Sequence, residues 1–253
     1  MGVKLNTSRY RGFGLPSPVL FPAVHTLSLT RVCSVWGWSD LFSPSNLPLL
    51  RKLCLKDCRG TYDLNINFPG LEILELDGLR LKGLDISGTG LLELQVTRCL
   101  RPKGRAKILA PNLRRLYWED NFNVKCGTQS FEDLNTGSVY FPSKPPNPAT
   151  LQSAAAFISA LCFARSLSVR SQVFKILSSM DSEDGLPFCF NNLTTLEIHT
   201  HLTKYGATGI ICLLRRSPIL HSINIRVDCS KLGNKSWDDD RYWPISELKY
   251  QVN

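Results

Sequence analysis

The chain repeats one short arrangement of apolar residues, L-x-x-L-x-L, in which the positions between and beside the last two leucines are mostly polar. Alternation of this kind is typical of a strand with one buried face. Most copies follow a turn that contains Pro or Gly, which ends the preceding element. The middle apolar residues of successive copies are Leu27, Leu53, Leu74, Leu94, Leu116, Leu167, Leu196 and Ile223. They lie 20 to 29 residues apart, except for a gap of 51 residues between Leu116 and Leu167.

A period of this length with this consensus is the signature of a leucine-rich repeat, in which every copy adds one strand to a parallel sheet. The repeat prefers Asn or Cys three residues after its last apolar position, because such a buried side chain can bond the backbone of the turn. The residues there are Val32, Cys58, Leu79, Cys99 and Asn121. Between copies, 64–66, 84–86 and 108–110 read as short strands, and 154–164 and 206–216 as helices. The sequence therefore predicts an α/β leucine-rich-repeat solenoid, curved, with a parallel concave sheet and mixed short strands and helices on the convex side.

We expect three regions along the chain: an irregular N-terminal segment at 1–18, the solenoid at 19–230 and a C-terminal tail at 231–253. Residues 123–150 depart from the repeat and end in the proline-dense run 142–148. We interpret them as a degenerate repeat around Val139 to Phe141, followed by an exposed loop insertion. A linker between two domains is the alternative, but the same repeat on both sides favours one continuous solenoid.

Several segments share a resemblance to one family: 41–58, 108–116, 163–169 and 190–198, together with 213–220 ahead of the last repeat. Over nearly the whole chain they resemble plant F-box/LRR-repeat (F-box/FBD/LRR) proteins. The tail residues Trp243-Pro244 and Leu248-Lys249-Tyr250 resemble the start of the FBD region of that family. The resemblance implies the substrate-recruiting subunit of a cullin-type ubiquitin ligase, in which the repeats hold the target while an N-terminal F-box docks a Skp-type adaptor.

The chain departs from that pattern near its first residues. An F-box opens with Leu-Pro and continues through leucine-rich helices, whereas Leu15-Pro16 is followed by Pro18 and then by a repeat strand. The adaptor and the cullin are therefore expected as partners only if a docking element is present. Two functions stay open: the substrate-recognition part of an F-box/LRR ubiquitin-ligase subunit, or an F-box-less scaffold, decoy or truncated gene product without a ligase role.

The predicted binding surface is the concave wall, where the residues between and beside the inward leucines face outward. This wall is mixed in sign, basic near Lys52 and Lys56 and acidic near Glu75, Asp77 and Glu93. A protein or peptide partner suits such patterning, whereas a nucleic acid needs an unbroken basic track. The alternative is that these are ordinary solvated strand residues.

Aromatic and arginine side chains concentrate binding energy, so Tyr117, Arg115 and Arg170 are the strongest candidates for contact with a protein target. The full set of predicted partner-binding residues is Lys52, Lys56, Glu75, Asp77, Glu93, Arg115, Tyr117, Glu119, Arg170, Glu197, His199 and Arg226.

The chain has 30 Lys and Arg against 21 Asp and Glu, a net charge of +9. Much of the excess falls on the connection between two repeats, at Arg98, Arg101, Lys103, Arg105 and Lys107. A solvated loop is one interpretation of this run. A patch for an acidic partner or for nuclear import is the other, and the interruptions at 102 and 104 weaken the import reading.

Sequence motifs for metal binding or catalysis are weak. His199-Thr200-His201 places two imidazoles on one face of a strand, but no further ligand pattern accompanies them, and Asp238-Asp239-Asp240 lacks the spacing of a calcium loop. We therefore expect no metal and no cofactor, and, with no nucleophile, base and orienter assembled by the repeat, no enzyme activity. Nine scattered cysteines, no signal peptide and no apolar run long enough to span a bilayer favour a cytoplasmic or nuclear protein with no membrane partner.

Overall fold

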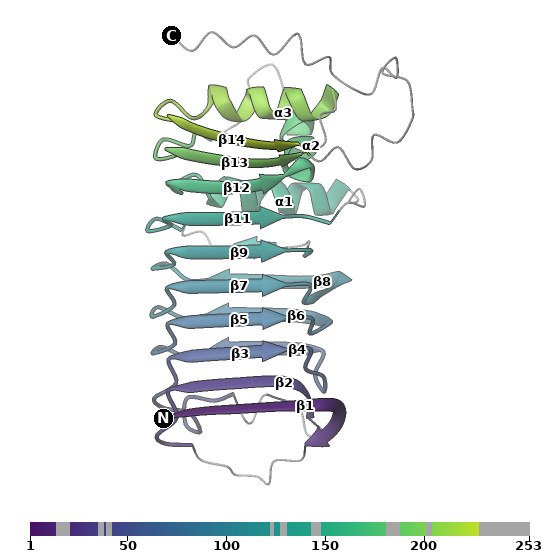
Figure 1. Cartoon of the computed structure of the whole chain (residues 1–253), viewed down its shortest axis with the longest axis vertical. Helices are drawn as coiled ribbons and strands as arrows, with labels where there is room; N and C mark the ends of the chain where they lie inside the picture. Colours follow the sequence, from purple (N-terminus) through teal and green to yellow (C-terminus); the bar gives the residue numbers. More distant parts are fainter. Residues whose placement is uncertain are drawn as a thin grey trace.

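The fold is known from a computed structural model that describes residues 1–13, 21–34, 38, 42–121, 124–126, 131–142, 148–180, 188–200 and 204–227. The tail at 231–253 lies outside these residues, as do His201 and Asp238–Asp240. The described chain winds as a solenoid of parallel strands, in which successive copies of the repeat stack along the long axis (Figure 1).

A ten-stranded parallel sheet runs the length of the described chain. Its strands are, in spatial order, β1 (Gly2–Phe13), β2 (Thr26–Ser34), β3 (Lys52–Lys56), β5 (Ile73–Asp77), β7 (Glu93–Thr97), β9 (Arg115–Glu119), β11 (Thr136–Tyr140), β12 (Ser166–Arg170), β13 (Thr195–Thr200) and β14 (Ser222–Val227). The marker residues of the repeat align across it: Leu27 pairs in register with Leu53, and Leu167 with Leu196. The predicted parallel sheet of stacked repeats is confirmed.

A second parallel sheet lies behind the first in the N-terminal half of the solenoid (Figure 1). Its strands are, in chain order, β4 (Asp63–Asn67), β6 (Leu81–Ser87), β8 (Leu100–Leu109) and β10 (Val124–Cys126). In the C-terminal half, helices take its place; they are α1 (Pro148–Ala160), α2 (Ser171–Met180) and α3 (Lys204–Arg215). The described fold is thus mainly a parallel β-solenoid with few helices.

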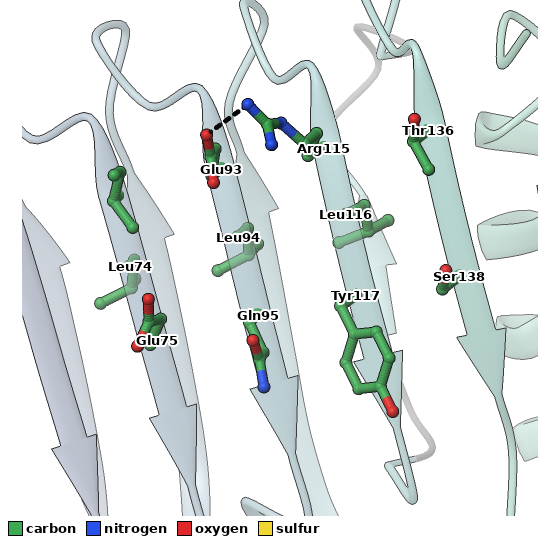
Figure 2. A pocket seen from close by; sticks show the side chains of 11 residues that line it. Leu74, Glu75, Glu93, Leu94, Gln95, Arg115, Leu116, Tyr117, Thr136 and Ser138 are labelled. Atoms are coloured by element: carbon green, nitrogen blue, oxygen red, sulfur yellow. Dashed lines mark ion pairs between the residues drawn. The ribbon is translucent and has the colours of Figure 1, made fainter. Parts of the chain in front are cut away.

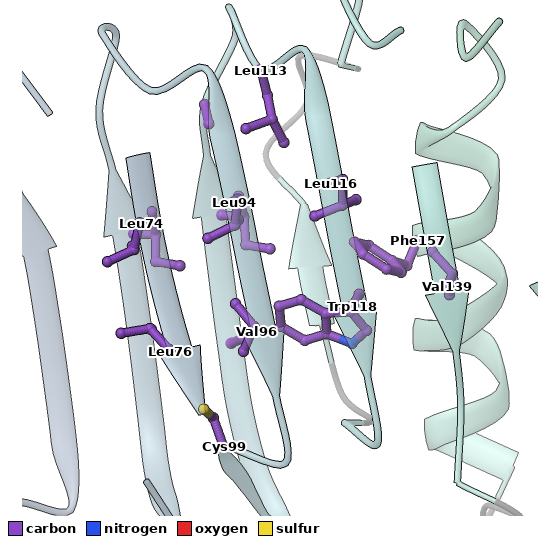
Figure 3. Packing of buried hydrophobic residues seen from close by; sticks show 14 of the residues in the cluster. Leu74, Leu76, Leu94, Val96, Cys99, Leu113, Leu116, Trp118, Val139 and Phe157 are labelled. Atoms are coloured by element: carbon purple, nitrogen blue, oxygen red, sulfur yellow. The ribbon is translucent and has the colours of Figure 1, made fainter. Parts of the chain in front are cut away.

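The core lies between these two layers. From β2 to β13 the inward side chains of the ten-stranded sheet are almost wholly buried, and they pack against those of the second sheet or the helices (Figure 3). On the last strand, β14, Ile223 and Ile225 are exposed. Trp118 on β9 lies where the layer behind the large sheet changes from strands to helices, because its ring lies 5.4 Å from that of Phe157 on α1. Burying aromatic side chains of this size is a large part of what stabilises such a layer.

The gap of 51 residues holds a complete repeat strand. β11 pairs with β9 on one side and β12 on the other, so the sheet continues through the predicted degenerate repeat. Gly137 occupies the position that leucine holds elsewhere, and a Cβ there would lie 3.3 Å from Leu167 and 3.7 Å from Leu134. Neighbouring leucines therefore fill the space that the missing side chain leaves.

The turn after each strand has one backbone conformation in five successive repeats. The residue that follows the strand has positive φ at Asp57, Gly78, Arg98 and Asp120, and Arg31 has the same conformation at the equivalent position within β2. The next residue points into the core, and at Asn121 its side chain bonds the turn as predicted: the Cys99 and Leu100 N–H groups both donate to Oδ1 at 2.8 Å. The repeat therefore fixes the turn as well as the strand.

Two expectations are wrong. The N-terminal segment 1–18 is not irregular over its first part, because β1 pairs in parallel with β2 and extends the sheet by one strand. The basic run near residue 105 is not a loop, because β8 pairs with β6 and with β10. Both segments have too few alternating leucines to signal a strand; backbone pairing to a neighbouring strand supplies the order instead.

Among the described residues, no helix is long and apolar enough to cross a lipid bilayer.

Candidate functional site

The candidate site is the outward face of the ten-stranded sheet from β3 to β14, which we name the polar face. Each strand offers three outward positions, and parallel pairing in register stacks them into three rows across the sheet. The twelve predicted partner-binding residues all lie on this face. Lys52, Glu93 and Arg115 fall in the first row; Glu75, Tyr117 and Glu197 in the middle row; and Lys56, Asp77, Glu119, Arg170, His199 and Arg226 in the third.

Charges on β3, β5, β7 and β9 pair with one another. The Lys52 ammonium lies 2.5 Å from a carboxylate oxygen of Glu75, and this hydrogen bond raises the pKa of Lys52. Lys56 lies 3.6 Å from Asp77. The sequence predicted separate basic and acidic regions here; the register of the strands instead joins them into ion pairs, which leaves this part of the polar face close to neutral.

A shallow pocket with a volume of about 240 Å³ opens on the polar face over β5, β7, β9 and β11 (Figure 2). The ion pair between Glu93 and Arg115, 2.9 Å apart, stands at one end, and Tyr117 lies toward the other. Uncharged side chains lie along the pocket between them, among them Gln95 and Ser138. A pocket of this size accommodates one or two side chains of a partner rather than a whole ligand.

Beside the pocket, four side chains from three strands form what we name the Tyr117–Arg170 cluster: Tyr117, Glu119, Tyr140 and Arg170. The Tyr117 hydroxyl donates to Glu119 at 2.8 Å, and the Arg170 guanidinium lies 2.8 Å from the other oxygen of that carboxylate. Arg170 also lies over the Tyr140 ring, 4.2 Å from its centroid, and the two tyrosine rings meet edge to face at 5.6 Å. Burial, with the bond to Glu119, raises the pKa of Tyr117 to about 12, so its hydroxyl stays protonated.

The hydrogen bonds continue from this cluster toward β14. The Tyr140 hydroxyl lies 2.7 Å from the Ser168 hydroxyl, which donates to Glu197 at 3.1 Å. The other oxygen of Glu197 lies 3.0 Å from the Arg226 guanidinium and 3.3 Å from the His199 ring. Half-buried polar groups linked in this way are held in fixed positions before any partner arrives.

Sequence reasoning found the charged members of the face and missed Tyr140, Thr136 and Ser138. All three belong to β11, whose strand was expected but whose outward positions could not be assigned while Gly137 concealed the register. The spacing of Gly137 and Val139, which alternate as the inward leucines do, is the signal that identifies them.

Metal chemistry finds no support in the part of the chain that the structure describes, where no group of three His, Cys, Asp or Glu side chains could hold an ion. Seven of the described cysteines carry free thiols: Cys33, Cys54, Cys58, Cys99, Cys162, Cys189 and Cys212. Burial raises the pKa of Cys58 to about 11 and that of Cys99 to about 12, which keeps both thiols protonated and unreactive.

No model of a known protein family matches the chain. The chain is similar to an F-box/FBD/LRR-repeat protein of Arabidopsis thaliana, with 28% identity over 250 residues. The alignment covers 91% of this chain and 48% of the relative, so the chain spans about half the length of the curated relative that it matches. The resemblance to plant F-box/LRR-repeat proteins is confirmed.

Proposed function

We propose that this chain is a protein-recognition module of the leucine-rich-repeat type, and that it serves as the substrate-binding part of an F-box/LRR ubiquitin-ligase subunit. In this proposal the ten-stranded sheet is the concave wall of the repeat and the polar face holds the target. The solenoid extends over 19–230, and 231–253 begins an FBD region. The module is non-enzymatic and acts in the cytoplasm or the nucleus.

The observation that carries the proposal is the Tyr117–Arg170 cluster beside the pocket. Tyrosine and arginine dominate the binding energy of protein interfaces, most of all where they stand near the centre of the contact and are already held in place. Here Glu119 orders both Tyr117 and Arg170, so a partner would bind them without first restricting their side chains. The pocket next to them, whose charged lining residues include the Glu93–Arg115 ion pair, offers a place for one side chain of the target.

The charge of the polar face favours a protein over a nucleic acid. Its cations are matched by carboxylates: Lys52 by Glu75, Arg115 by Glu93 and Arg226 by Glu197. A phosphate backbone would have to displace these carboxylates one after another, whereas a protein surface with alternating charges can insert between the pairs.

The ligase role rests on similarity to the Arabidopsis F-box/FBD/LRR-repeat protein, of which this chain spans about half. The rival function is a scaffold or decoy that binds the same targets without an adaptor. The two functions share the polar face and differ in whether a Skp-type adaptor and a cullin accompany the bound target.

The test is affinity capture from plant extract with the full chain as bait, in three forms: the natural sequence, Arg170→Ala and Arg51→Ala. Arg51 is a matched control, because it is an exposed arginine directly before β3 that also forms an ion pair, with Glu72, yet it lies outside the Tyr117–Arg170 cluster. We expect Arg170→Ala to reduce recovery of a specific protein about tenfold or more, as loss of a hot-spot residue does. Arg51→Ala should retain it.

Each outcome decides between functions. Recovery of the adaptor and cullin together with the target supports the ligase subunit, and recovery of the target alone supports the scaffold. Equal recovery by the natural chain and Arg170→Ala, with circular dichroism showing both folded, would mean that the polar face does not hold the target.

A further inference from the structure

A second charged surface lies on the other side of the solenoid, on the second sheet. We name it the basic cluster: Lys82 on β6 and Arg101, Lys103, Arg105 and Lys107 on β8, all with exposed side chains. The sequence grouped Arg98 with this run, but Arg98 belongs to the edge of the polar face, where it lies 2.8 Å from Asp77. The other four cations of that run stay together on β8.

Arg101 and Lys103, the first two cations of the cluster on β8, lie in a bulge of that strand. β6 and β8 pair at Leu81 and Leu100 and again at Gly83 and Arg105, so β8 has three more residues than β6 between these two points. Gly104 permits the bulge, because a Cβ there would lie 2.8 Å from the Leu81 carbonyl oxygen. After the bulge, Arg105 and Lys107 alternate with buried Ala106 and Ile108 and therefore face outward.

Two of the cations lie over the ring of an exposed tyrosine. The side chain of Tyr62, which precedes β4, is 56% exposed. The Arg101 guanidinium carbon lies 4.6 Å from its ring centroid and the Lys82 ammonium 5.0 Å from it. Arg101 is further fixed by donating from Nε to the Arg80 carbonyl oxygen at 2.8 Å. Two like charges on one ring repel each other, and an anion placed between them relieves that repulsion.

The basic cluster differs from the polar face in lacking counter-ions. On the polar face the cations of Lys52, Arg115 and Arg170 each have a carboxylate within 4.0 Å. Among the residues that the structure describes, no carboxylate lies that close to the cations of the basic cluster. Five exposed cations without a carboxylate partner among the described residues therefore lie together on β6 and β8.

We propose that the basic cluster is a docking surface for an acidic peptide segment, a stretch rich in Asp and Glu, of a partner protein. Arginine binds carboxylates through two parallel hydrogen bonds, and the short run on β8 suits an extended segment of a few acidic residues. Asp85 on β6 pairs in register with Lys107, and Asp63 lies on the next strand, β4, so the basic surface does not continue as the long track that a nucleic acid follows.

An apolar side chain next to the cations also favours a peptide. Leu109 follows Lys107 on the same side of β8 and is 38% exposed. A peptide can place an apolar residue against it beside its carboxylates, whereas a phosphate backbone has no group that would gain from the contact.

The test measures binding to the full chain by fluorescence anisotropy, with a labelled peptide of about ten residues that consists of Glu with one Leu near its end, the length of an extended segment that spans β8. A labelled single-stranded oligonucleotide of similar length serves as the second probe. Arg105→Glu/Lys107→Glu reverses two charges of the cluster. The control, Arg165→Glu/Arg215→Glu, makes the same change of net charge at exposed arginines outside it.

We expect the peptide to bind the natural chain, and Arg105→Glu/Lys107→Glu to weaken this binding about tenfold or more, with an effect of about twofold or less in the control. Far-ultraviolet circular dichroism checks that both variants fold, and Tyr62→Ala, which leaves the charge unchanged, should also weaken binding. Equal weakening in the two double variants, no peptide binding, or tighter binding of the oligonucleotide would each overturn the proposal. Capture of a target through the polar face should be unaffected, so failure here and failure of the proposed function are separable.

Discussion

Replacing Asn121 by alanine removes the side chain that links the turns after β7 and β9. Its carbonyl oxygen accepts from the N–H groups of Cys99 and Leu100, both at 2.8 Å. Its amide group donates to the Val96 carbonyl at 3.1 Å and to the Glu119 carbonyl at 2.6 Å. The residue is 1% exposed, so water barely reaches these bonds. The Glu119 carbonyl also accepts from the Arg98 N–H at 2.9 Å and therefore keeps a partner when the side chain is removed.

The cost of the substitution follows from which of the four groups water can reach afterwards. The bonds to the Cys99 N–H and the Val96 carbonyl are buried, whereas those to the Leu100 N–H and the Glu119 carbonyl are partly buried. Each buried group left without a partner costs about 1–3 kcal/mol, and the two accessible groups cost little because water replaces the amide. We therefore expect Asn121→Ala to lower the free energy of unfolding by about 4 kcal/mol.

Urea unfolding followed by circular dichroism measures this loss, with Asn112→Ala as the matched control. The Asn112 side chain is exposed and donates a single bond, at 2.7 Å, to the Thr89 carbonyl, so its loss should cost about 1 kcal/mol or less. Hydrogen exchange gives an independent readout, because the Cys99 and Leu100 amides should exchange faster in Asn121→Ala under native conditions. A loss no larger than that of Asn112→Ala, with unchanged exchange, would refute the account of the turn.

Three further predictions test other parts of the structure. The pKa of Tyr117 is raised from 10.0 to about 12, so the protonated phenol stabilises the fold below pH 10 and this contribution is lost as pH rises toward 12; urea unfolding across this range should show a smaller loss in Tyr117→Phe. Cys58 and Cys99, whose thiol pKa values are raised to about 11 and about 12, should resist iodoacetamide at pH 8 in the folded chain and react in urea, as peptide mass spectrometry would show. Trp118→Ala, which removes a fully buried ring packed on Phe157, should cost about 3–5 kcal/mol in urea unfolding; a loss below 1 kcal/mol would contradict the packing between β9 and α1.

The repeat pattern predicts the sheet because the inward marker position of each strand must be buried and is usually occupied by leucine. Where that residue is Gly137, the pattern disappears although the strand persists, since leucines from neighbouring elements occupy the space. β1 shows the complementary case. Its apolar positions are few, and its strand forms by pairing with the backbone N–H and C=O groups that the edge of β2 offers. Composition alone therefore predicts neither β11 nor β1.

For the candidate site, prediction from the sequence has a different limit. The outward positions follow from the alternation along each strand, and all twelve predicted residues lie on the polar face. What could not be predicted is which of them meet, because that depends on the register between strands that are about twenty or more residues apart in sequence. Glu119, for example, pairs with Arg170 across the intervening strand β11, and Tyr140 of β11 lies beneath the guanidinium. A sequence that conceals the register of β11 conceals this contact as well.

Salt should weaken binding at the basic cluster much more than binding at the polar face. The reason is that the cations of the polar face are paired with carboxylates and those of the basic cluster are not. On the polar face the attraction between Glu119 and Arg170 is already satisfied within the chain, so a target gains mainly from aromatic contact and from the pocket, both of which salt screens little. On the basic cluster the cations of Arg105 and Lys107 have no carboxylate partner in the described chain, so an acidic peptide gains mainly from unscreened charge. The two surfaces lie on different sheets (Figure 1), and the buried core lies between these sheets, so one surface can be filled while the other stays open. Raising the ionic strength from about 0.05 to 0.5 M should therefore release the peptide while the target of the polar face stays bound, which a common binding site for both would not allow.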